Sequence, residues 1–201
     1  MFIKAKLYHQ AVSKSKFLCY FIGLTKVKGE QIMSVILNEK IFLTKFKVDS
    51  PVEVSGNNGQ NPWIAKLMAE FEEHLDEEDL LDKQHWLKIE SRFLRKKSPA
   101  LGEYLLFDLK VDGQFYMACC RCLAPLKTVV ALDVKNIFMP QEKADEESEE
   151  TTVFVEGCER ELYLLSENGE ANIGEVAHEQ CMLEIPAYPK CEGECQNQVL
   201  F

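Results

Sequence analysis

The sequence lacks the features that several large classes of protein require. Its 201 residues contain no run of 18 apolar residues, and the longest apolar stretch, at 17–24, is soon followed by Lys26 and Lys28. A transmembrane helix needs about 20 apolar residues in succession, so we expect no membrane span and no membrane partner. Basic residues are also in the minority, because 23 Lys and Arg stand against 33 Asp and Glu, a net charge of −10. This balance disfavours a protein that coats nucleic acid through a broad basic face.

Motifs for most kinds of catalysis are missing as well. The chain has no Gly-rich phosphate loop and no nucleophile elbow, and the metalloprotease pattern His-Glu-x-x-His fails after His178 because Met182 takes the second His position. A zinc deaminase would need His-x-Glu upstream of its Cys pair, and none precedes Cys119. Four His in all leave little for acid–base catalysis. These catalytic interpretations are therefore poorly supported, and we expect no small-molecule substrate.

Cysteine is too sparse for a disulfide scaffold, because eight residues make up only about 4% of the chain. The N-terminus has a basic flank and a short apolar stretch but no small-residue cleavage site, so it does not read as a signal peptide. We expect a reducing cytoplasm, where closely spaced Cys are typical of metal or redox sites.

Four of the cysteines form two close pairs, Cys119-x-x-Cys122 and Cys191-x-x-x-Cys195. Such spacing lets both sulfurs of a pair reach one ion from a single turn, and two turns complete a tetrahedral zinc site. We predict a structural zinc, since four sulfurs leave no open position for water. Two alternatives stay open: free thiols with accidental spacing, or a redox centre at Cys119 and Cys122. A redox centre normally lies at a helix N-terminus, which this pattern does not predict.

The predicted fold is α+β, with a mostly antiparallel sheet, two main helices and a Cys-rich turn pair. Several segments alternate between apolar and polar residues with a period of two, which predicts strands. These segments are 41–48, 87–93, 103–111, 115–119, 128–138, 152–155 and 161–165. Asp112-Gly113 is typical of a hairpin turn, so we expect the chain to reverse there. We expect a loop at 55–60 and another turn at Ala124-Pro125.

Both helices are predicted from their start signals. Asn61-Pro62 supplies an N-cap and a Pro at the first helical position, and an apolar stripe follows at Trp63, Leu67, Phe71 and Leu75. Asn172, with Glu175 three residues later, predicts the second helix in capping-box spacing. The acidic residues of the first helix and the loop after it are interpreted as a solvated surface.

Residues 1–32 differ from the rest, because they hold six Lys and one Glu. We interpret them as a basic extension that is either not translated, with Met33 as the working start, or poorly ordered. The alternative is a basic arm that touches RNA or a partner. Residues 33–201 are then a single domain with an acidic loop at 141–151.

An acidic total can hide a local basic surface. Two runs, at 70–82 and 142–150, hold most of the excess acid. The predicted contacts for RNA or a partner are Arg92, Arg95, Lys96, Lys97 and Arg121. The alternative is that these residues form a solvated strand end and that the acidic runs bind a basic protein.

Two segments resemble the YceD family, the large ribosomal RNA subunit accumulation proteins. Residues 113–125 (GQFYMACCRCLAP) are similar to its Cys-x-Arg-Cys-Leu-x-Pro signature, with matches at Cys119, Arg121, Cys122, Leu123 and Pro125. Residues 179–195 (EQCMLEIPAYPKCEGEC) are similar to its second signature, an acidic helix leading into a Pro-rich stretch and spaced Cys. The matching residues there are Glu179, Ile185, Pro186, Pro189, Cys191 and Cys195. The resemblance is loose over 33–112 and absent over 1–32.

This resemblance implies a non-enzymatic bacterial or plastid factor that supports accumulation of large-subunit ribosomal RNA and ribosome biogenesis. Its implied partner is ribosomal RNA or a large-subunit ribosomal protein, in the cytoplasm or, in a plant, the plastid. Many members carry further Cys after the last pair and some lack part of the set, so zinc is our inference from spacing. The alternatives are a thiol-redox enzyme using Cys119 and Cys122, or an acidic module that binds a basic ribosomal protein.

Overall fold

A computed structural model describes residues 37–141, 151–193 and 195. The predicted basic extension at 1–32 lies outside these residues, as do residues 142–150 of the predicted acidic loop, so both stay predictions. Over the described part of the chain, no helix combines the length and the apolar character needed to cross a bilayer.

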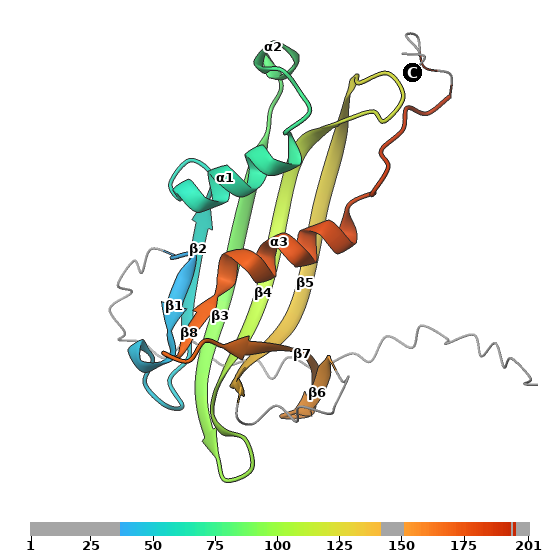
Figure 1. The fold of residues 1–201 in the computed structure, drawn as a ribbon. Helices are drawn as coiled ribbons and strands as arrows, with labels where there is room; N and C mark the ends of the chain where they lie inside the picture. Colours follow the sequence, from blue (N-terminus) through green and yellow to red (C-terminus); the bar gives the residue numbers. More distant parts are fainter. Residues whose placement is uncertain (1–36, 142–150, 194, 196–201) are drawn as a thin grey trace, which may run out of the picture. The chain divides into compact units, whose positions relative to one another are not determined.

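The fold is built on a six-stranded sheet (Figure 1). Its spatial order is β2-β3-β4-β5-β7-β6. The strands are β2 (Val52–Asn57), β3 (Trp86–Ser98), β4 (Gly102–Ala118), β5 (Pro125–Pro140), β6 (Thr152–Val155) and β7 (Cys158–Leu165). The predicted α+β class is confirmed, but the sheet is mixed: β5 and β7 run parallel while the other pairs are antiparallel.

Two further strands and three helices complete the described chain. The short strands β1 (Lys40–Phe42) and β8 (Glu170–Asn172) pair antiparallel in a sheet of their own. Helices α1 (Pro62–Phe71) and α3 (Ile173–Glu184) lie on one face of the large sheet (Figure 1), and α2 (Glu77–Leu80) is a single turn. Both predicted helix starts are confirmed. The Asn172 side chain accepts a hydrogen bond from the Glu175 N–H at 3.2 Å.

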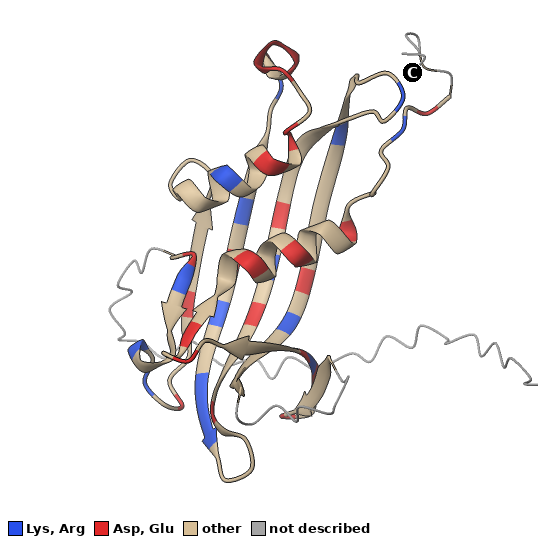
Figure 2. Cartoon of the chain, in the orientation of Figure 1, with Lys and Arg blue, Asp and Glu red and all other residues tan. Residues whose placement is uncertain are grey.

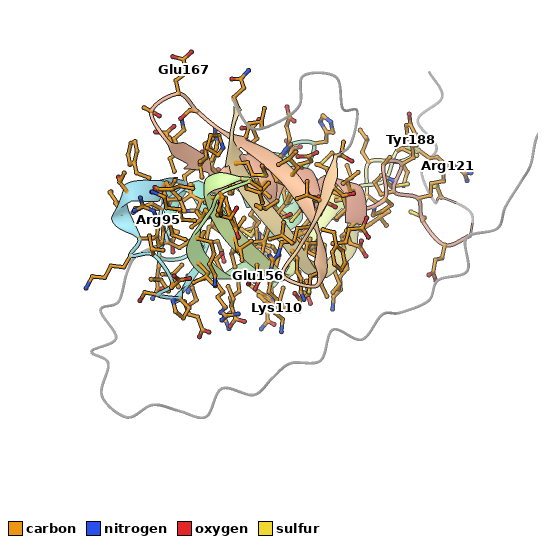
Figure 3. The ribbon with its side chains drawn as sticks, turned by 90° about the horizontal axis from the view of Figure 1, so that it is seen from below. Arg95, Lys110, Arg121, Glu156, Glu167 and Tyr188 are labelled. Atoms are coloured by element: carbon orange, nitrogen blue, oxygen red, sulfur yellow. The ribbon has the colours of Figure 1, made fainter. Side chains whose placement is uncertain are left out.

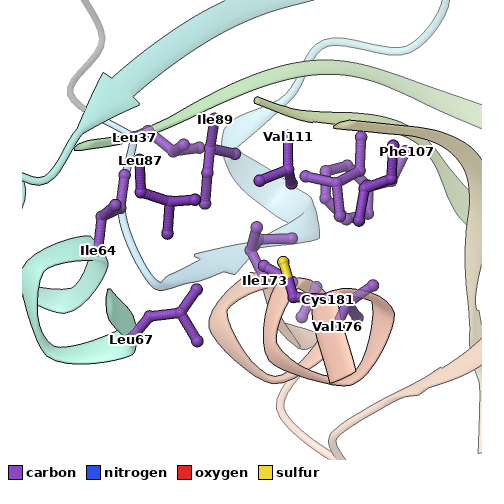
Figure 4. Packing of buried hydrophobic residues seen from close by; sticks show 14 of the residues in the cluster. Leu37, Ile64, Leu67, Leu87, Ile89, Phe107, Val111, Ile173, Val176 and Cys181 are labelled. Carbon is purple, nitrogen blue, oxygen red and sulfur yellow. The ribbon is translucent and has the colours of Figure 1, made fainter. Parts of the chain in front are cut away.

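The main core lies between the sheet and the two helices. Strand alternation turns every second residue of β3 and β4 toward the helices, where these side chains meet the apolar stripes of α1 and α3 (Figure 4). Phe93 stacks on Phe107 with ring centroids 5.0 Å apart, and Phe107 lies 5.9 Å from Phe138. Each fully buried large side chain contributes about 1.5–3 kcal/mol, so this face supplies most of the stability.

A smaller apolar cluster covers part of the opposite face. Tyr104, Leu106, Ile137 and Met139 are buried there and pack against the β6–β7 hairpin. Residues 152–155 and 161–165 were expected to be short strands that pair with each other. Both lie in strands, but the pairing is shifted: β6 pairs with residues 158–161, and residues 161–165 pair with β5 instead. The turn of the β6–β7 hairpin has positive φ at both Glu156 and Gly157, which is the geometry of a type I′ turn. Both faces of β4 and β5 are therefore buried near this end.

The predicted hairpin at Asp112-Gly113 is wrong. β4 continues straight through both residues, and Gly113 pairs with Leu87 on β3 and Val130 on β5. A Cβ on Gly113 would lie 2.6 Å from the Leu87 Cδ1 atom and 3.0 Å from the Trp86 carbonyl oxygen. Glycine is needed here because a neighbouring strand approaches closely. In the sequence, a glycine required for this reason looks the same as one required for a turn. The reversal between β3 and β4 instead falls between Ser98 and Gly102.

The predicted strand at 41–48 and loop at 55–60 are also displaced. β1 ends at Phe42, and residues 43–45 form a 3-10 turn that buries Leu43. That turn directs Phe46 onto Phe93, with ring centroids 5.2 Å apart. The next strand, β2, then occupies the first half of the predicted loop. Burial of two apolar side chains here outweighs the strand propensity of the segment.

Candidate metal centre

The first cysteine pair lies in the tight turn between β4 and β5. Ala118 and Pro125 are the last paired residues of the hairpin. Inside it, the Cys119 N–H donates to the Ala124 carbonyl and the Leu123 N–H donates to the Cys119 carbonyl, each at 2.9 Å. Leu123 has a φ of 59°, a left-handed conformation that closes the turn. This backbone turns the side chains of Cys119 and Cys122 toward the same point.

The second pair lies in the extended segment that follows α3. The helix ends before Pro186, because a residue preceding proline is disfavoured in helical conformation. The segment then runs alongside the first turn, where the Cys120 N–H donates to the Pro189 carbonyl at 2.9 Å. Gly193 has a φ of 92°, which glycine adopts without strain, and it turns the chain between Cys191 and Cys195.

The four sulfur atoms converge at one point. Their ligand atoms all lie within 4.8 Å of one another. The Cys119 and Cys195 sulfurs are 3.9 Å apart, and those of Cys122 and Cys191 are 3.6 Å apart. A tetrahedral ion with metal–sulfur bonds of about 2.3 Å needs sulfurs about 3.8 Å apart. These four residues, brought together from positions some 70 apart in sequence, could hold one metal ion.

Backbone hydrogen bonds favour a charged sulfur at Cys119. The N–H of Arg121 is the largest contributor, with those of Cys191 and Cys122 beside it, and together they lower the pKa of Cys119 to about 6. The neighbouring thiol of Cys191 shares a hydrogen bond with that sulfur, which raises the pKa of Cys191 to about 12. A metal ligand must be a thiolate, so the N–H groups aimed at Cys119 fit the chemistry of the donor set.

The predicted basic residues of β3 do not form one surface. Strand alternation places Arg92 and Lys96 on one face of the sheet and Arg95 and Lys97 on the other. Arg95 donates to Glu103 and lowers the pKa of that carboxyl, with a smaller contribution from Lys97.

The basic residues on the other face of β3 also have acidic partners. Lys96 lies 3.0 Å from Asp49 and 3.1 Å from Glu156, and these hydrogen bonds raise the pKa of Lys96. Arg92 lies between Glu53 and Asp108, at 3.9 and 3.8 Å. Basic and acidic residues alternate along β3, β4 and β5 (Figure 2). No broad basic field therefore builds up over the described sheet.

Arg121 differs from these four residues. It is exposed in the cysteine turn and has no ion-pair partner within the described ranges. Figure 3 shows Arg121 and Tyr188 at the same end of the described domain. Tyr188 is 77% exposed and was not predicted as a contact residue, although its position between Pro186 and Pro189 was a signal of rigid display.

One comparison with known proteins supports the resemblance seen in the sequence. Residues 107–200 match the family model described as Large ribosomal RNA subunit accumulation protein YceD. The matched region runs from within β4 and includes all four converging cysteines. No curated protein and no solved structure gave a match. The predicted YceD resemblance is confirmed over these residues.

Proposed function

From the YceD family match over residues 107–200, we propose that this protein supports accumulation of large-subunit ribosomal RNA, and with it ribosome biogenesis. It acts as a non-enzymatic factor, through contact with ribosomal RNA or a large-subunit ribosomal protein. Its place of action is the cytoplasm, or the plastid if the source is a plant. The family match is the observation that carries this proposal.

The proposed cofactor is one structural zinc ion held by Cys119, Cys122, Cys191 and Cys195. Four thiolates in tetrahedral spacing suit zinc or iron, and zinc forms closed sites of this kind in many small domains. Bound there, the ion would join the β4–β5 turn to the segment after α3. Its contribution is to folding, since a fourfold sulfur site leaves no position for a substrate.

The thiol-redox alternative has less support. Cys119 is fully buried, whereas a catalytic thiolate must meet its substrate. Cys122, its proposed partner, lies 3.6 Å from Cys191 rather than alone beside Cys119. The acidic-module alternative keeps one point in its favour, because the first turn of α2 contains three acids, Glu77, Glu78 and Asp79.

The test of the proposal is genetic and direct. Cells lacking the gene should contain less large-subunit than small-subunit ribosomal RNA, measured by electrophoresis and by sucrose-gradient profiles of the subunits. The wild-type gene and the Cys120→Ser variant should both restore the ratio. A normal ratio in the deletion strain would overturn the proposal.

A further inference from the structure

The surface that surrounds the four cysteines carries exposed aromatic, apolar and basic side chains. Tyr188 is 77% exposed and Leu123 is 51% exposed, while Arg121, Lys127 and Lys190 are also exposed. Two different elements supply these residues: the β4–β5 turn with the start of β5, and the segment after α3. We call the five residues Arg121, Leu123, Lys127, Tyr188 and Lys190 the cysteine-turn surface.

Leu123 combines a left-handed backbone with an exposed apolar side chain. Its φ of 59° belongs to a region that glycine or asparagine occupies with less strain, yet the position holds a leucine whose side chain faces solvent. A strained backbone and an exposed apolar side chain both reduce stability or solubility. The left-handed backbone is explained by the turn that brings Cys119 and Cys122 together, but the choice of an exposed leucine at this position is not, and it favours a contact with another molecule.

Tyr188 is displayed on a rigid support. Pro186 and Pro189 flank it at short range and fix two of the local φ angles. The Cys120–Pro189 hydrogen bond at 2.9 Å anchors the segment to the first turn, and the Cys122 and Cys191 sulfurs lie 3.6 Å apart just beyond it. An aromatic ring held this way loses little conformational entropy when another flat group stacks on it.

The charges favour an anionic partner at this surface. Three cations lie here, and Glu192 is the acidic residue within the described parts of the two turns, 119–125 and 186–193. A basic ribosomal protein would meet repulsion from Arg121, Lys127 and Lys190. The acidic residues of α2 lie on a separate helical turn near the same end of the sheet (Figure 2). Exposed aromatic and apolar side chains beside Arg and Lys are the combination that binds unpaired nucleotides, through stacking and phosphate contact.

We propose that the cysteine-turn surface binds single-stranded RNA, with a base stacked on Tyr188, apolar contact from Leu123, and phosphates paired with Arg121 and its neighbouring lysines. This inference rests on the proposed function, because it identifies the contact through which that function is exerted. Few cations take part, so stacking supplies much of the affinity and the dependence on salt is shallow. Duplex RNA, whose bases are already stacked, binds more weakly.

The test measures binding of the full metal-loaded chain to a fluorescein-labelled 12-nucleotide single-stranded RNA by fluorescence anisotropy. Tyr188→Ala should weaken binding about tenfold, in keeping with the loss of one stacked base. Tyr188→Phe should bind like the wild type, since stacking uses the ring. Phe154→Ala is the matched control, because Phe154 is also 77% exposed but lies on β6.

A second variant separates binding from folding. Leu123→Gly relieves the left-handed strain, so it should keep or raise the melting temperature while it weakens RNA binding several-fold. Equal RNA affinity for Tyr188→Ala and Phe154→Ala would overturn this inference, as would equal affinity for single-stranded and duplex RNA. The inference would also be overturned if the wild-type chain binds no RNA and instead binds a large-subunit ribosomal protein or a second copy of itself. In each case the proposed function stands or falls separately, on the RNA ratio of the deletion strain.

Discussion

The Cys120 N–H donates a hydrogen bond to the Pro189 carbonyl at 2.9 Å, and this contact joins two turns that are far apart in sequence. It aligns the backbone of the β4–β5 turn with the segment after α3, without using any sulfur atom. Cys122 lies two residues after Cys120, and Cys191 lies two residues after Pro189, so their sulfurs meet at 3.6 Å. The ligands are thus partly arranged by the backbone, which reduces the entropy lost on metal binding.

Removal of one cysteine from the set should abolish metal binding. Cys122→Ser should lower bound zinc from one equivalent to less than a tenth, measured by elemental analysis of the purified chain. The melting temperature should fall on the order of 10 °C, because metal binding free energy at such a site is also folding free energy. A chelator added to the wild type should have the same effect on melting.

Cys120→Ser is the matched control for that variant. Cys120 lies in the same turn, but it is exposed and its sulfur is not one of the four that converge. Its metal content and melting temperature should equal those of the wild type. Equal metal content in Cys122→Ser and Cys120→Ser would eliminate the fourfold site, and one equivalent of iron instead of zinc would correct the identity of the ion.

Thiol reactivity should follow burial and metal protection. Cys120 is exposed and should be alkylated by iodoacetamide at pH 8 within minutes. Cys181 is fully buried on the side of α3 that faces the core, and burial raises the pKa of Cys181 to about 12, so it should react only after unfolding. Mass spectrometry of digested samples gives the order of labelling. Labelling of Cys181 as fast as Cys120 would contradict the packing of α3 on the sheet.

The same shift predicts a loss of stability in alkali. The unfolded thiol of Cys181 has a pKa near its ordinary value of 9.0, and the folded value is about 12. The folded state holds its proton more tightly, so the stabilising effect of the neutral thiol is complete below pH 9. It is lost as the pH rises from 9 toward 12. Cys181→Ala should therefore show a smaller decrease in unfolding free energy over that range than the wild type.

Gly113→Ala should destabilise the sheet by about 1–3 kcal/mol, because the new methyl group would overlap Leu87 and approach the Trp86 carbonyl. Urea unfolding measures the change. Gly59→Ala is a suitable control, since its Cβ would meet the Asn57 Oδ1 atom at 3.3 Å and nothing nearer. If the two variants lose equal stability, the close approach of β3 to Gly113 is not what requires glycine there.

Local signals in the sequence predicted some elements well and others not at all. The two helix starts depend on the few residues around them. Asn172 caps α3 with its side chain, and at α1 Pro62 occupies the first helical position, while the Asn61 side chain makes no capping hydrogen bond. The turn predicted at Gly113 was wrong because glycine is required there for a nonlocal reason. Leu87 on the neighbouring strand leaves no room for a side chain at that position. The parallel pairing of β5 with β7 was likewise beyond local patterns, since it depends on how the β6–β7 hairpin packs over Ile137 and Met139.

The candidate site was also predictable from the sequence only in part. The convergence of the four cysteines was predictable, because the short spacing within each pair is the spacing typical of metal-ligating turns. The contact surface was not, because a run of basic residues in sequence says nothing about their partners in space. Arg95 and Lys97 meet Glu103 across a strand pair, and Lys96 meets Asp49. Tyr188 was overlooked because a single aromatic residue in a Pro-rich segment has no period to reveal it.

Deletion of residues 1–32 should leave the melting temperature of the domain almost unchanged. The prediction rests on the basic, aperiodic composition of that segment, which contrasts with the alternating patterns after Met33. Differential scanning calorimetry of the full chain and of a chain starting at Met33 provides the comparison. A decrease of several degrees would mean that the apolar stretch at 17–24 contributes to the core.

The salt dependence of RNA binding should identify which cations meet phosphate. For single strands, each contact contributes about 0.7 to the slope of log affinity against log salt concentration. Arg121→Gln should therefore reduce the slope by about that amount, because Arg121 has no carboxylate partner in the described chain.

The basic residues of β3 should behave differently. Arg92→Gln and Lys97→Gln remove cations that already lie near Asp108 and Glu103, so their slopes should match the wild type. The two residues also lie on opposite faces of β3, and one strand of RNA can lie along only one face. A reduced slope for one of them, with Arg121→Gln unchanged, would move the RNA contact from the cysteine turn to that face of the sheet. If the slope is unchanged in all three variants, the better explanation of the function is that the acidic runs at 70–82 and 142–150 bind a basic ribosomal protein.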